Sequence, residues 1–398
     1  MTYKRFIVAL LIILAAISCS KDGSKVVYLT VSPTNLSAPF TMNSQDIEVQ
    51  SNGSWTIKVL SSDGDEVSWA KPNRVKGDGD SRISIRVSKN EYNEDRSALI
   101  TVLSETGDTA SVSLIQAGNP DSESTVTEVT LRIGNYNLKV VKNSDTGENA
   151  WDKRKLRLTQ SIYDNDFDVF GVNECNTKMK EFINSELAKD YNIKFFSPYS
   201  QDGEGDDAQG LLYRKSFALL DWHYFWLSET PNVMVANDPN GATTYNRGGC
   251  CGTLEHKETG IKFFVMVTHG AKNQSVRDEF ADVYIDMEKK YNPNRYPSFF
   301  VGDMNARPGQ SSVKTYQTYW KDVYLEVSSE NRIGPFSTYN GFDTSLNLNT
   351  DPRRIDYIFY RNATPLNYVC NDKMYGGCYA SDHLPVYSDM KISITTAE

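Results

Sequence analysis

Residues 381–386 read SDHLPV, which places a carboxylate beside an imidazole just before an apolar stretch. Two more acids lie near the ends of segments with the pattern of buried strands. FFVGDMN at 299–305 carries Asp303, and RIDYIF at 354–359 carries Asp356. Buried strands that each deliver an acid near one end predict a hydrolytic metal site built on a rigid sheet.

The bulk composition is that of a folded protein with more than one domain. The chain has 398 residues, of which 39% are hydrophobic and 23% charged, which suffices for two or three domains with a sizeable core. A net charge of −9 argues against a sequence-independent nucleic-acid binder, which needs a basic face. Phosphate substrates stay compatible with this acidity, because a bound divalent cation supplies local positive charge.

The first residues have the pattern of an export signal. Lys4-Arg5 precedes an apolar run over 6–17, and Cys19 follows; the run is too short to span a bilayer comfortably. Residues 16–19 resemble a lipobox, and the next residues resemble surface-export signals of Bacteroidetes lipoproteins. We predict a lipoprotein signal peptide over 1–19 with Cys19 as its lipidation site; the alternative is a plain cleaved signal. The protein is then expected to be exported and lipid-anchored in the outer membrane, with the cell surface as a further option.

Residues 26–118 predict a small all-β module. Apolar residues alternate with polar ones between turn signals every 8 to 12 positions, which is typical of an immunoglobulin-like β-sandwich. The module resembles the BACON family, through LTVSP at 29–33, VQSNGSW at 49–55 and IQAG at 115–118. That resemblance implies glycan or mucin contact. Trp55 and Trp69 are either sugar-stacking residues or core residues of a spacer module, and the alternation favours the core.

A polar stretch at 119–124 predicts a linker, and the pattern then changes. From 125 to 398, buried strands alternate with helices that are apolar on one face. This pattern predicts an α/β (α+β) domain whose sheets are covered by helices.

The polar residues of this domain that could take part in catalysis or metal binding lie at or near predicted strand ends, where active sites of layered folds gather. They are Asn137, Glu174, His269, Asp303, Asn305, Asp356, Asp382 and His383. The carboxylates of Glu174 and Asp382 and the carbonyl of Asn137 are hard oxygen ligands, which suit Mg²⁺ or Mn²⁺. A zinc site would have more closely spaced His or Cys ligands.

Taken together, these motifs resemble the endonuclease/exonuclease/phosphatase superfamily, the deoxyribonuclease-like fold. The resemblance covers about 125–395 and rests on YN at 136–137, GVNE at 171–174, GLLYR at 210–214, TH at 268–269, GDMN at 302–305, RIDYI at 354–358 and SDHLPV at 381–386. It implies a four-layer αββα sandwich with the site at one edge of its two sheets. Glu174 is then the principal metal ligand, with Asn137 and Asp382 in or around its coordination shell.

The resemblance also implies catalytic roles. Asp303, helped by Asn305, would orient or deprotonate the attacking water. His383, held by Asp356, would stabilise the pentavalent phosphorus centre or assist proton transfer. His269 would contact the phosphate or the leaving group.

Some residues depart from the pattern or leave alternatives open. Asn173 stands where Gln commonly precedes the metal-binding Glu, and Gly270 replaces the Leu usual after Thr-His. Arg247 is either a phosphate contact or a solvated loop residue. Besides Cys19, five of the six cysteines remain, an odd number that leaves at least one thiol unpaired or paired between chains. Cys370 with Cys378 is the favoured bridge, and the sequence does not settle the connectivity.

These observations predict an exported, Mg²⁺- or Mn²⁺-dependent phosphoesterase that hydrolyses phosphodiester or phosphomonoester bonds by in-line attack of an activated water. Small, sugar-linked or lipid-linked phosphates are favoured over nucleic acid, because no strong basic surface is evident. The alternatives are an extracellular nuclease and a non-catalytic, glycan-binding surface lipoprotein. A membrane partner is expected only through the lipid anchor.

Overall fold

The computed structural model describes residues 28–62, 64–122, 124–234 and 246–397. The predicted signal peptide and Cys19 lie outside these residues. Within the described part, no helix is long and apolar enough to cross a membrane. The chain divides into an N-terminal unit, Met1–Thr125 together with Thr395–Glu398, and a C-terminal unit, Val126–Ile394.

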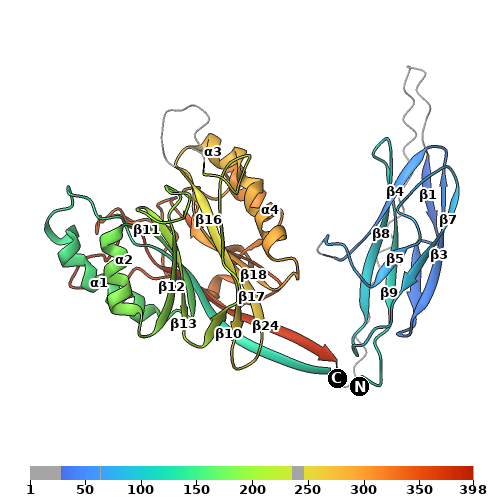
Figure 1. The fold of residues 1–398 in the computed structure, drawn as a ribbon, viewed down its shortest axis with the longest axis horizontal. Helices are drawn as coiled ribbons and strands as arrows, with labels where there is room; N and C mark the ends of the chain where they lie inside the picture. The colour runs from blue at the N-terminus through green and yellow to red at the C-terminus, as the bar shows by residue number, and fades with distance from the viewer. Residues whose placement is uncertain (1–27, 63, 123, 235–245, 398) are drawn as a thin grey trace, which may run out of the picture. The chain divides into compact units, whose positions relative to one another are not determined.

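The N-terminal unit is an all-β sandwich of two sheets (Figure 1). One sheet has the order β1-β3-β7-β5, with bounds Leu29–Ser32, Asn43–Ser51, Ser81–Val87 and Ala70–Pro72. The other has the order β2-β9-β8-β4-β6, with bounds Asn35–Ala38, Thr109–Gln116, Arg96–Ser104, Ser54–Leu60 and Lys76–Asp78. Every second residue of β4 is buried, as a half-exposed sheet requires.

The two tryptophans of this unit differ in burial. Trp55 is buried in the core and donates a hydrogen bond from Nε1 to the carbonyl of Gly79 at 2.9 Å. Trp69 is partly buried against the same core, and the guanidinium of Arg96 lies 4.4 Å from its ring centroid. The expectation that alternation puts Trp55 in the core is confirmed.

The C-terminal unit contains two larger sheets. The first has the order β12-β13-β11-β10-β24-β23-β20, with bounds Tyr191–Phe196, Ala208–Arg214, Val169–Cys175, Ser124–Asn137, Val386–Ala397, Tyr368–Cys370 and Arg332–Ile333, and with β22 (Thr364–Pro365) beside β24. The second has the order β14-β16-β17-β18-β21-β19, with bounds Phe217–Leu219, Gly248–His256, Lys262–His269, Ser298–Asp303, Asp356–Arg361 and Lys321–Asp322, and with β15 (His223–Trp226) beside β16.

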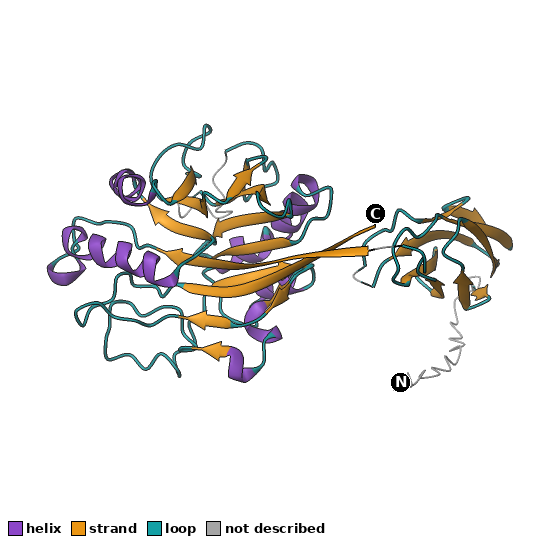
Figure 2. Ribbon diagram, turned by 90° about the horizontal axis from the view of Figure 1, so that it is seen from below, coloured by secondary structure: helices purple, strands orange, loops and turns teal. Residues whose placement is uncertain are grey.

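Helices cover the outer face of each sheet, and apolar side chains fill the space between the sheets. Helices α1 (Trp151–Asn165) and α2 (Thr177–Leu187) pack on the first sheet. Helices α4 (Ala281–Tyr291) and α5 (Ser311–Gln317) pack on the second. Shorter helices are α3 (Gln274–Glu279) and α6 (Val323–Glu326). The result is the predicted four-layer αββα sandwich, with strands inside and helices at the periphery (Figure 2).

Strand β17 shows why its sequence is apolar on both faces. Phe263, Val265 and Val267 face the core between the sheets, whereas Phe264 and Met266 face the helices. A strand buried on both faces needs a continuous apolar run rather than an alternation. The apolar run ends at Val267, and the polar residues Thr268 and His269 follow at the end of the strand.

The expected Cys370–Cys378 disulfide is wrong. The five cysteines of the described residues are all free thiols. Cys370 is buried at the end of β23, where its Sγ contacts the carbonyl of Ser337 at 3.5 Å, whereas Cys378 forms an isolated bridge with Tyr375. The two thiols belong to different local structures, which sequence spacing does not reveal.

Candidate active site

The predicted site residues of the second sheet lie on one rung. Strand β18 runs parallel to β17 and antiparallel to β21, so that His269 is paired with Asp303 and Asp303 with Asp356. In the first sheet, Asn137 and Asn173 are paired on β10 and β11. The strand ends of both sheets therefore deliver their polar residues to the same edge of the sandwich.

Glu174 lies at an irregularity of β11. The pairing of β11 with β13 shifts between Val172 and Cys175, and Glu174 has a left-handed backbone with φ 64°. Such bulges re-aim side chains and often occur next to active sites. The Glu174 carboxylate accepts hydrogen bonds from Val140 N at 3.0 Å and from Asn137 Nδ2 at 3.2 Å.

Burial on its own raises the pKa of Glu174, but the charge that His269 carries when it is protonated in acid, the Val140 N–H and the charge of His383 outweigh burial and lower that pKa to about 2. The pKa of His269 is itself lowered to about 4, first by burial and then by the charge of Arg247. His269 is therefore neutral at neutral pH. The carboxylate of Glu174 stays ionised there, and the Val140 N–H and the His383 charge support it.

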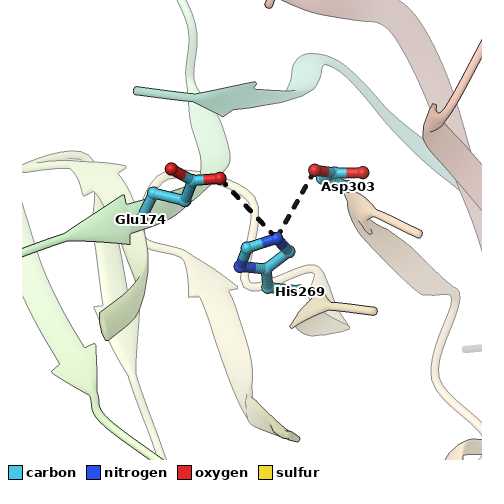
Figure 3. A group of neighbouring side chains, drawn as sticks. All are labelled: Glu174, His269 and Asp303. Carbon is cyan, nitrogen blue, oxygen red and sulfur yellow. Dashed lines mark ion pairs between the residues drawn. The ribbon is translucent and has the colours of Figure 1, made fainter. Parts of the chain in front are cut away.

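Glu174, His269 and Asp303 converge in space (Figure 3). His269 Nε2 lies 3.9 Å from Glu174 Oε1 and 3.5 Å from Asp303 Oδ2. One possible ligand atom of each residue lies within 4.8 Å of those of the other two. This spacing matches ligand atoms that surround one cation.

Four buried atoms of site residues lack a hydrogen-bond partner among the residues that the structure describes. They are Asn135 Oδ1, Asp382 Oδ1, His269 Nδ1 and His269 Nε2. Burial raises the pKa of Asp382, and the nearby carboxylate of Glu174 adds to the rise. Unpaired buried polar atoms are costly. A divalent cation would satisfy Asp382 Oδ1 and offset the crowding of carboxylates, so the residues present fit a metal ion.

His383 and Asp356 form a hydrogen-bonded pair. His383 Nδ1 lies 2.8 Å from Asp356 Oδ2. Burial alone lowers the pKa of His383, but the carboxylates of Asp356 and Asp303 outweigh it and raise that pKa to about 10. At neutral pH the imidazole is therefore charged and donates from both nitrogens. Its Nε2 faces Asp303 Oδ2 at 3.7 Å.

Three asparagines of the first sheet reach across to the second. Asn135 Nδ2 donates to Asp356 Oδ1 at 3.1 Å, and Asn137 Nδ2 donates to Asp303 Oδ2 at 3.0 Å. Asn173 donates to the carbonyl of Thr268 at 2.8 Å and accepts from the backbone N–H of Asp303 at 3.1 Å. These bridges fix the two halves of the site relative to each other.

For Asn137, the structure places the amide nitrogen rather than the carbonyl near the carboxylates. Its Oδ1 accepts from the backbone N–H of Lys139 at 3.0 Å. A supporting position beside the metal ligands matches this arrangement more closely than direct ligation through the carbonyl. Its part in metal binding stays a prediction.

Arg247 is not a solvated loop residue. Its side chain is buried, and Nη1 lies 3.1 Å from Asp207 Oδ2 while Nε donates to the carbonyl of Gly270 at 3.2 Å. Asp207 in turn lies 4.0 Å from His269 Nδ1. The guanidinium thus borders the site through Asp207, and a phosphate contact by Arg247 stays a prediction.

Asn305 and Gly270 shape the floor beside Asp303. The backbone N–H of Asn305 donates to Asp303 Oδ1 at 2.8 Å, and Asn305 Nδ2 donates to the carbonyl of Gly270 at 3.0 Å. A Cβ at Gly270 would lie 2.2 Å from the carbonyl oxygen of Met304. The loop after His269 therefore approaches the loop after Asp303 too closely for any side chain, which accounts for glycine at this position.

Sequence patterns missed four residues of the site: Asn135, Asp207, Thr338 and Tyr339. Thr338 Oγ1 donates to Asp356 Oδ2 at 2.7 Å and accepts from the backbone N–H groups of Ile355 and Asp356 at 3.0 Å each. Asn135 interrupts the apolar part of β10, a feature of the sequence from which this site residue could have been predicted. Thr338 and Tyr339 lie in an irregular segment, where no periodicity marks them.

Comparisons with known proteins agree with this geometry. Residues 135–383 match the model of the Endonuclease/Exonuclease/phosphatase family, and residues 47–117 match BACON, a proposed N-terminal binding domain. No curated protein matches the chain.

Solved structures resemble the C-terminal unit. An endonuclease/exonuclease/phosphatase family protein from Bacteroides thetaiotaomicron is 25% identical, with a TM-score of 0.60 over 67% of this chain and 99% of that one. A mannosyl-6-phosphatase from the same organism is also 25% identical, with a TM-score of 0.58 over 65% and 99%. The human Nocturnin catalytic domain, with a bound sulfate anion, shares the fold at 20% identity, with a TM-score of 0.52 over 69% and 98%.

Members of the family typically use a divalent metal and act on phosphoester bonds, and the acid and histidine groups gathered at this sheet edge could bind such an ion. The chain belongs to the Endonuclease/Exonuclease/phosphatase family.

Proposed function

We propose that this protein is a Mg²⁺- or Mn²⁺-dependent phosphoesterase that hydrolyses its substrate by in-line attack of water. The observation that carries the proposal is the convergence of Glu174, His269 and Asp303 beside the unpartnered Asp382 Oδ1. Glu174 and Asp382 would hold the ion, with Asn137 beside them. When bound, the ion offsets the negative charge that develops on the phosphoryl and leaving oxygens.

Asp303 is proposed to orient the attacking water and accept its proton. Asn305 N–H and Asn137 Nδ2 fix its two oxygens. Burial raises the pKa of Asp303 above its ordinary value, against the opposing charge of His383. A carboxylate with a raised pKa is a stronger base, while its hydrogen bonds keep it in one orientation.

The two histidines are proposed to act on the phosphoryl group in different protonation states. His383 is held by Asp356 and would donate a hydrogen bond from Nε2 to a phosphoryl oxygen, which stabilises the charge of the pentavalent centre. Neutral His269 would contact the phosphate or the leaving group. Environments that separate the pKa values of two similar groups are typical of sites that divide acid and base roles.

A phosphomonoester of a small polar alcohol, such as a sugar, is the substrate class that we favour. The mannosyl-6-phosphatase resembles this chain as closely in sequence as the other Bacteroides protein does. The net charge of −9 also disfavours a long polyanion. An extracellular nuclease is the second candidate, because family members include nucleases.

Export and lipid anchoring in the outer membrane belong to the same proposal. They rest on the basic start, the short apolar run and Cys19 in the first nineteen residues. Glycan contact through the N-terminal unit is proposed from its match to BACON. Labelling cells with a lipid-anchor precursor, with Cys19→Ala as control, tests the anchoring.

A substrate panel tests the activity. The full chain is incubated with mannose 6-phosphate, other sugar phosphates, a phosphodiester, DNA and phospholipid, with Mg²⁺, with Mn²⁺ and with EDTA. We expect phosphate release that EDTA abolishes and Mg²⁺ or Mn²⁺ restores. Absence of product from every substrate with either ion would overturn the proposal in favour of a non-catalytic glycan binder.

A further inference from the structure

Tyr339 lies against the catalytic histidine. Its backbone forms an isolated antiparallel bridge with His383. Its ring meets the His383 ring edge to face, with centroids 5.0 Å apart. Tyr339 directly follows Thr338, which holds Asp356, so the segment that orients the histidine also places the tyrosine.

Arg353 and Asp351 hold the other side of the Tyr339 ring. The guanidinium of Arg353 lies 4.6 Å from the ring centroid. Its Nε and Nη2 are bound to the Asp351 carboxylate at 2.8 and 2.6 Å, and Ser337 Oγ donates to the same carboxylate at 3.0 Å. A cation stacked on an aromatic ring and fixed by an ion pair leaves the ring little freedom.

The hydroxyl of Tyr339 is free to bind a ligand. Among the residues that the structure describes, it has no hydrogen-bond partner, although the side chain is only partly exposed. Gly341 has φ 61°, which favours glycine, and a Cβ there would lie 3.2 Å from Tyr339 Cε1 and 3.4 Å from the hydroxyl oxygen. The turn at Gly341 therefore passes directly beside the Tyr339 ring.

The electrostatic surroundings keep this hydroxyl protonated. Burial raises the pKa of Tyr339, and the carboxylates of Asp382, Glu174 and Asp303 add to the rise against the opposing charge of Arg353. The edge-to-face contact with the His383 ring and the backbone bridge to His383 place this tyrosine beside the group that is proposed to contact the phosphoryl oxygens. Tyr339 presents a neutral O–H donor to an anionic acceptor, and hydrogen bonds to charged groups are stronger than neutral ones.

We propose that Tyr339 is a further substrate-contacting residue, whose hydroxyl donates a hydrogen bond to a non-bridging oxygen of the bound phosphoryl group. Arg353 is a positioning residue that acts through the Tyr339 ring. This inference rests on the proposed phosphoesterase function and adds a donor beside His383. It assigns recognition of the phosphate to the segment 337–353, outside the motifs of the family resemblance.

Tyr339→Phe tests the assignment, because it keeps the ring and removes only the hydroxyl. We expect kcat/KM to fall about 10- to 100-fold, the range for losing one hydrogen bond to a charged group, with an unchanged Tm. The matched control is Tyr360→Phe on the same strand as Asp356. Tyr360 is buried and pairs with Phe299, four rungs from the Asp303–Asp356 rung. The control should keep wild-type kcat/KM.

Binding of inorganic phosphate distinguishes a failure of the Tyr339 assignment from a failure of the proposed phosphoesterase function. By calorimetry with Mg²⁺ present, Tyr339→Phe should weaken phosphate binding about 10-fold relative to wild type and to Tyr360→Phe. Equal binding and equal turnover in the Tyr339→Phe variant would overturn the assignment while the phosphoesterase function stands. A wild-type protein that binds no phosphate and hydrolyses no substrate would overturn both.

A double-mutant cycle tests the role of Arg353. Arg353→Lys keeps the charge but loses the planar stack, and we expect kcat/KM to fall less than in Tyr339→Phe. If Arg353 acts through the tyrosine, the double variant should be no worse than Tyr339→Phe alone. Losses that add would show that Arg353 acts independently, which contradicts the positioning role.

Discussion

Asp303 and Asp356 lie opposite each other on β18 and β21, but their carboxylates are held differently. Asp356 accepts hydrogen bonds from Thr338, His383 and Asn135 at 2.7 to 3.1 Å. Asp303 Oδ2 faces His269 and His383 at 3.5 and 3.7 Å, beyond ordinary hydrogen-bond distance. Asp356, with three hydrogen bonds, is suited to orient the histidine, whereas Asp303 accepts two, from Asn305 N–H and Asn137 Nδ2, and keeps capacity to receive a proton.

Replacing His383 should abolish most of the turnover. We expect His383→Asn to lower kcat by about 10²- to 10⁴-fold, because it removes the charged donor that faces the phosphoryl group. Steady-state kinetics on the best substrate of the panel would measure this. His256→Asn is the control, since His256 ends β16, where its Nδ1 lies 3.0 Å from Thr259 Oγ1 and its ring packs against Phe217. A His383→Asn variant with near wild-type kcat would contradict the role.

Thr338 should support turnover and stability through its hydrogen bond to Asp356. Thr338→Val keeps the shape of the side chain but leaves Asp356 Oδ2 and two backbone N–H groups without this partner. We expect the free energy of unfolding to fall by about 1 to 3 kcal/mol and kcat to fall about 10-fold. Thr338→Ser should restore both, because the hydroxyl is retained. Denaturant unfolding and steady-state kinetics measure both variants. If Thr338→Ser is as impaired as Thr338→Val, the loss comes from packing and not from the hydroxyl.

Asn173 should stabilise the junction of the two sheets. Asn173→Ala removes the bridge to the carbonyl of Thr268 and the N–H of Asp303, both in the buried second sheet. We expect a loss of about 2 to 4 kcal/mol in the free energy of unfolding, since two buried groups lose a partner. Urea denaturation measures it, with the exposed Asn184→Ala as control. Equal stability of the two variants would refute the bridge.

The ion pair of Asp351 should make stability depend on acid pH. The hydrogen-bonded contact with Arg353 lowers the pKa of Asp351 to about 2, from an ordinary value of 3.8. A carboxyl group whose pKa is lowered by folding stabilises the protein above its unfolded pKa, and that contribution is lost as the pH falls toward the folded pKa. Asp351→Asn should therefore lower the Tm at pH 6 and converge with wild type near pH 2. A constant difference in Tm from pH 6 to pH 2 would contradict this linkage.

Much of the fold could be predicted from local sequence. The apolar run of β17 and the acids that close β11 and β18 are local features, and they predicted sheets with polar residues at one edge. Glu174, His269 and Asp303 were named on that basis, and the structure brings them together. Whether each of them binds metal or substrate stays a prediction.

The partners of these residues could not be predicted in the same way. For Arg247, the sequence allows either a phosphate contact or a solvated loop residue, and in the structure its side chain is buried against Asp207. The bridge between Cys370 and Cys378 was expected from spacing alone, and both thiols are free. Both cases concern two side chains whose contact depends on how a loop folds back.

The sequence by itself determined which strands and helices form and which acids and histidines end them. Hydrophobic periodicity, and the change to polar or turn residues where a strand ends, are patterns of a few neighbouring residues. Only the tertiary structure decided that Asn135 reaches Asp356 and that Tyr339 packs on His383. Asn135 and Asp356 are 221 residues apart in the sequence. Tyr339 lies in an irregular segment that no periodicity marks. Both contacts form because two sheets pack face to face and set loops from distant parts of the chain side by side.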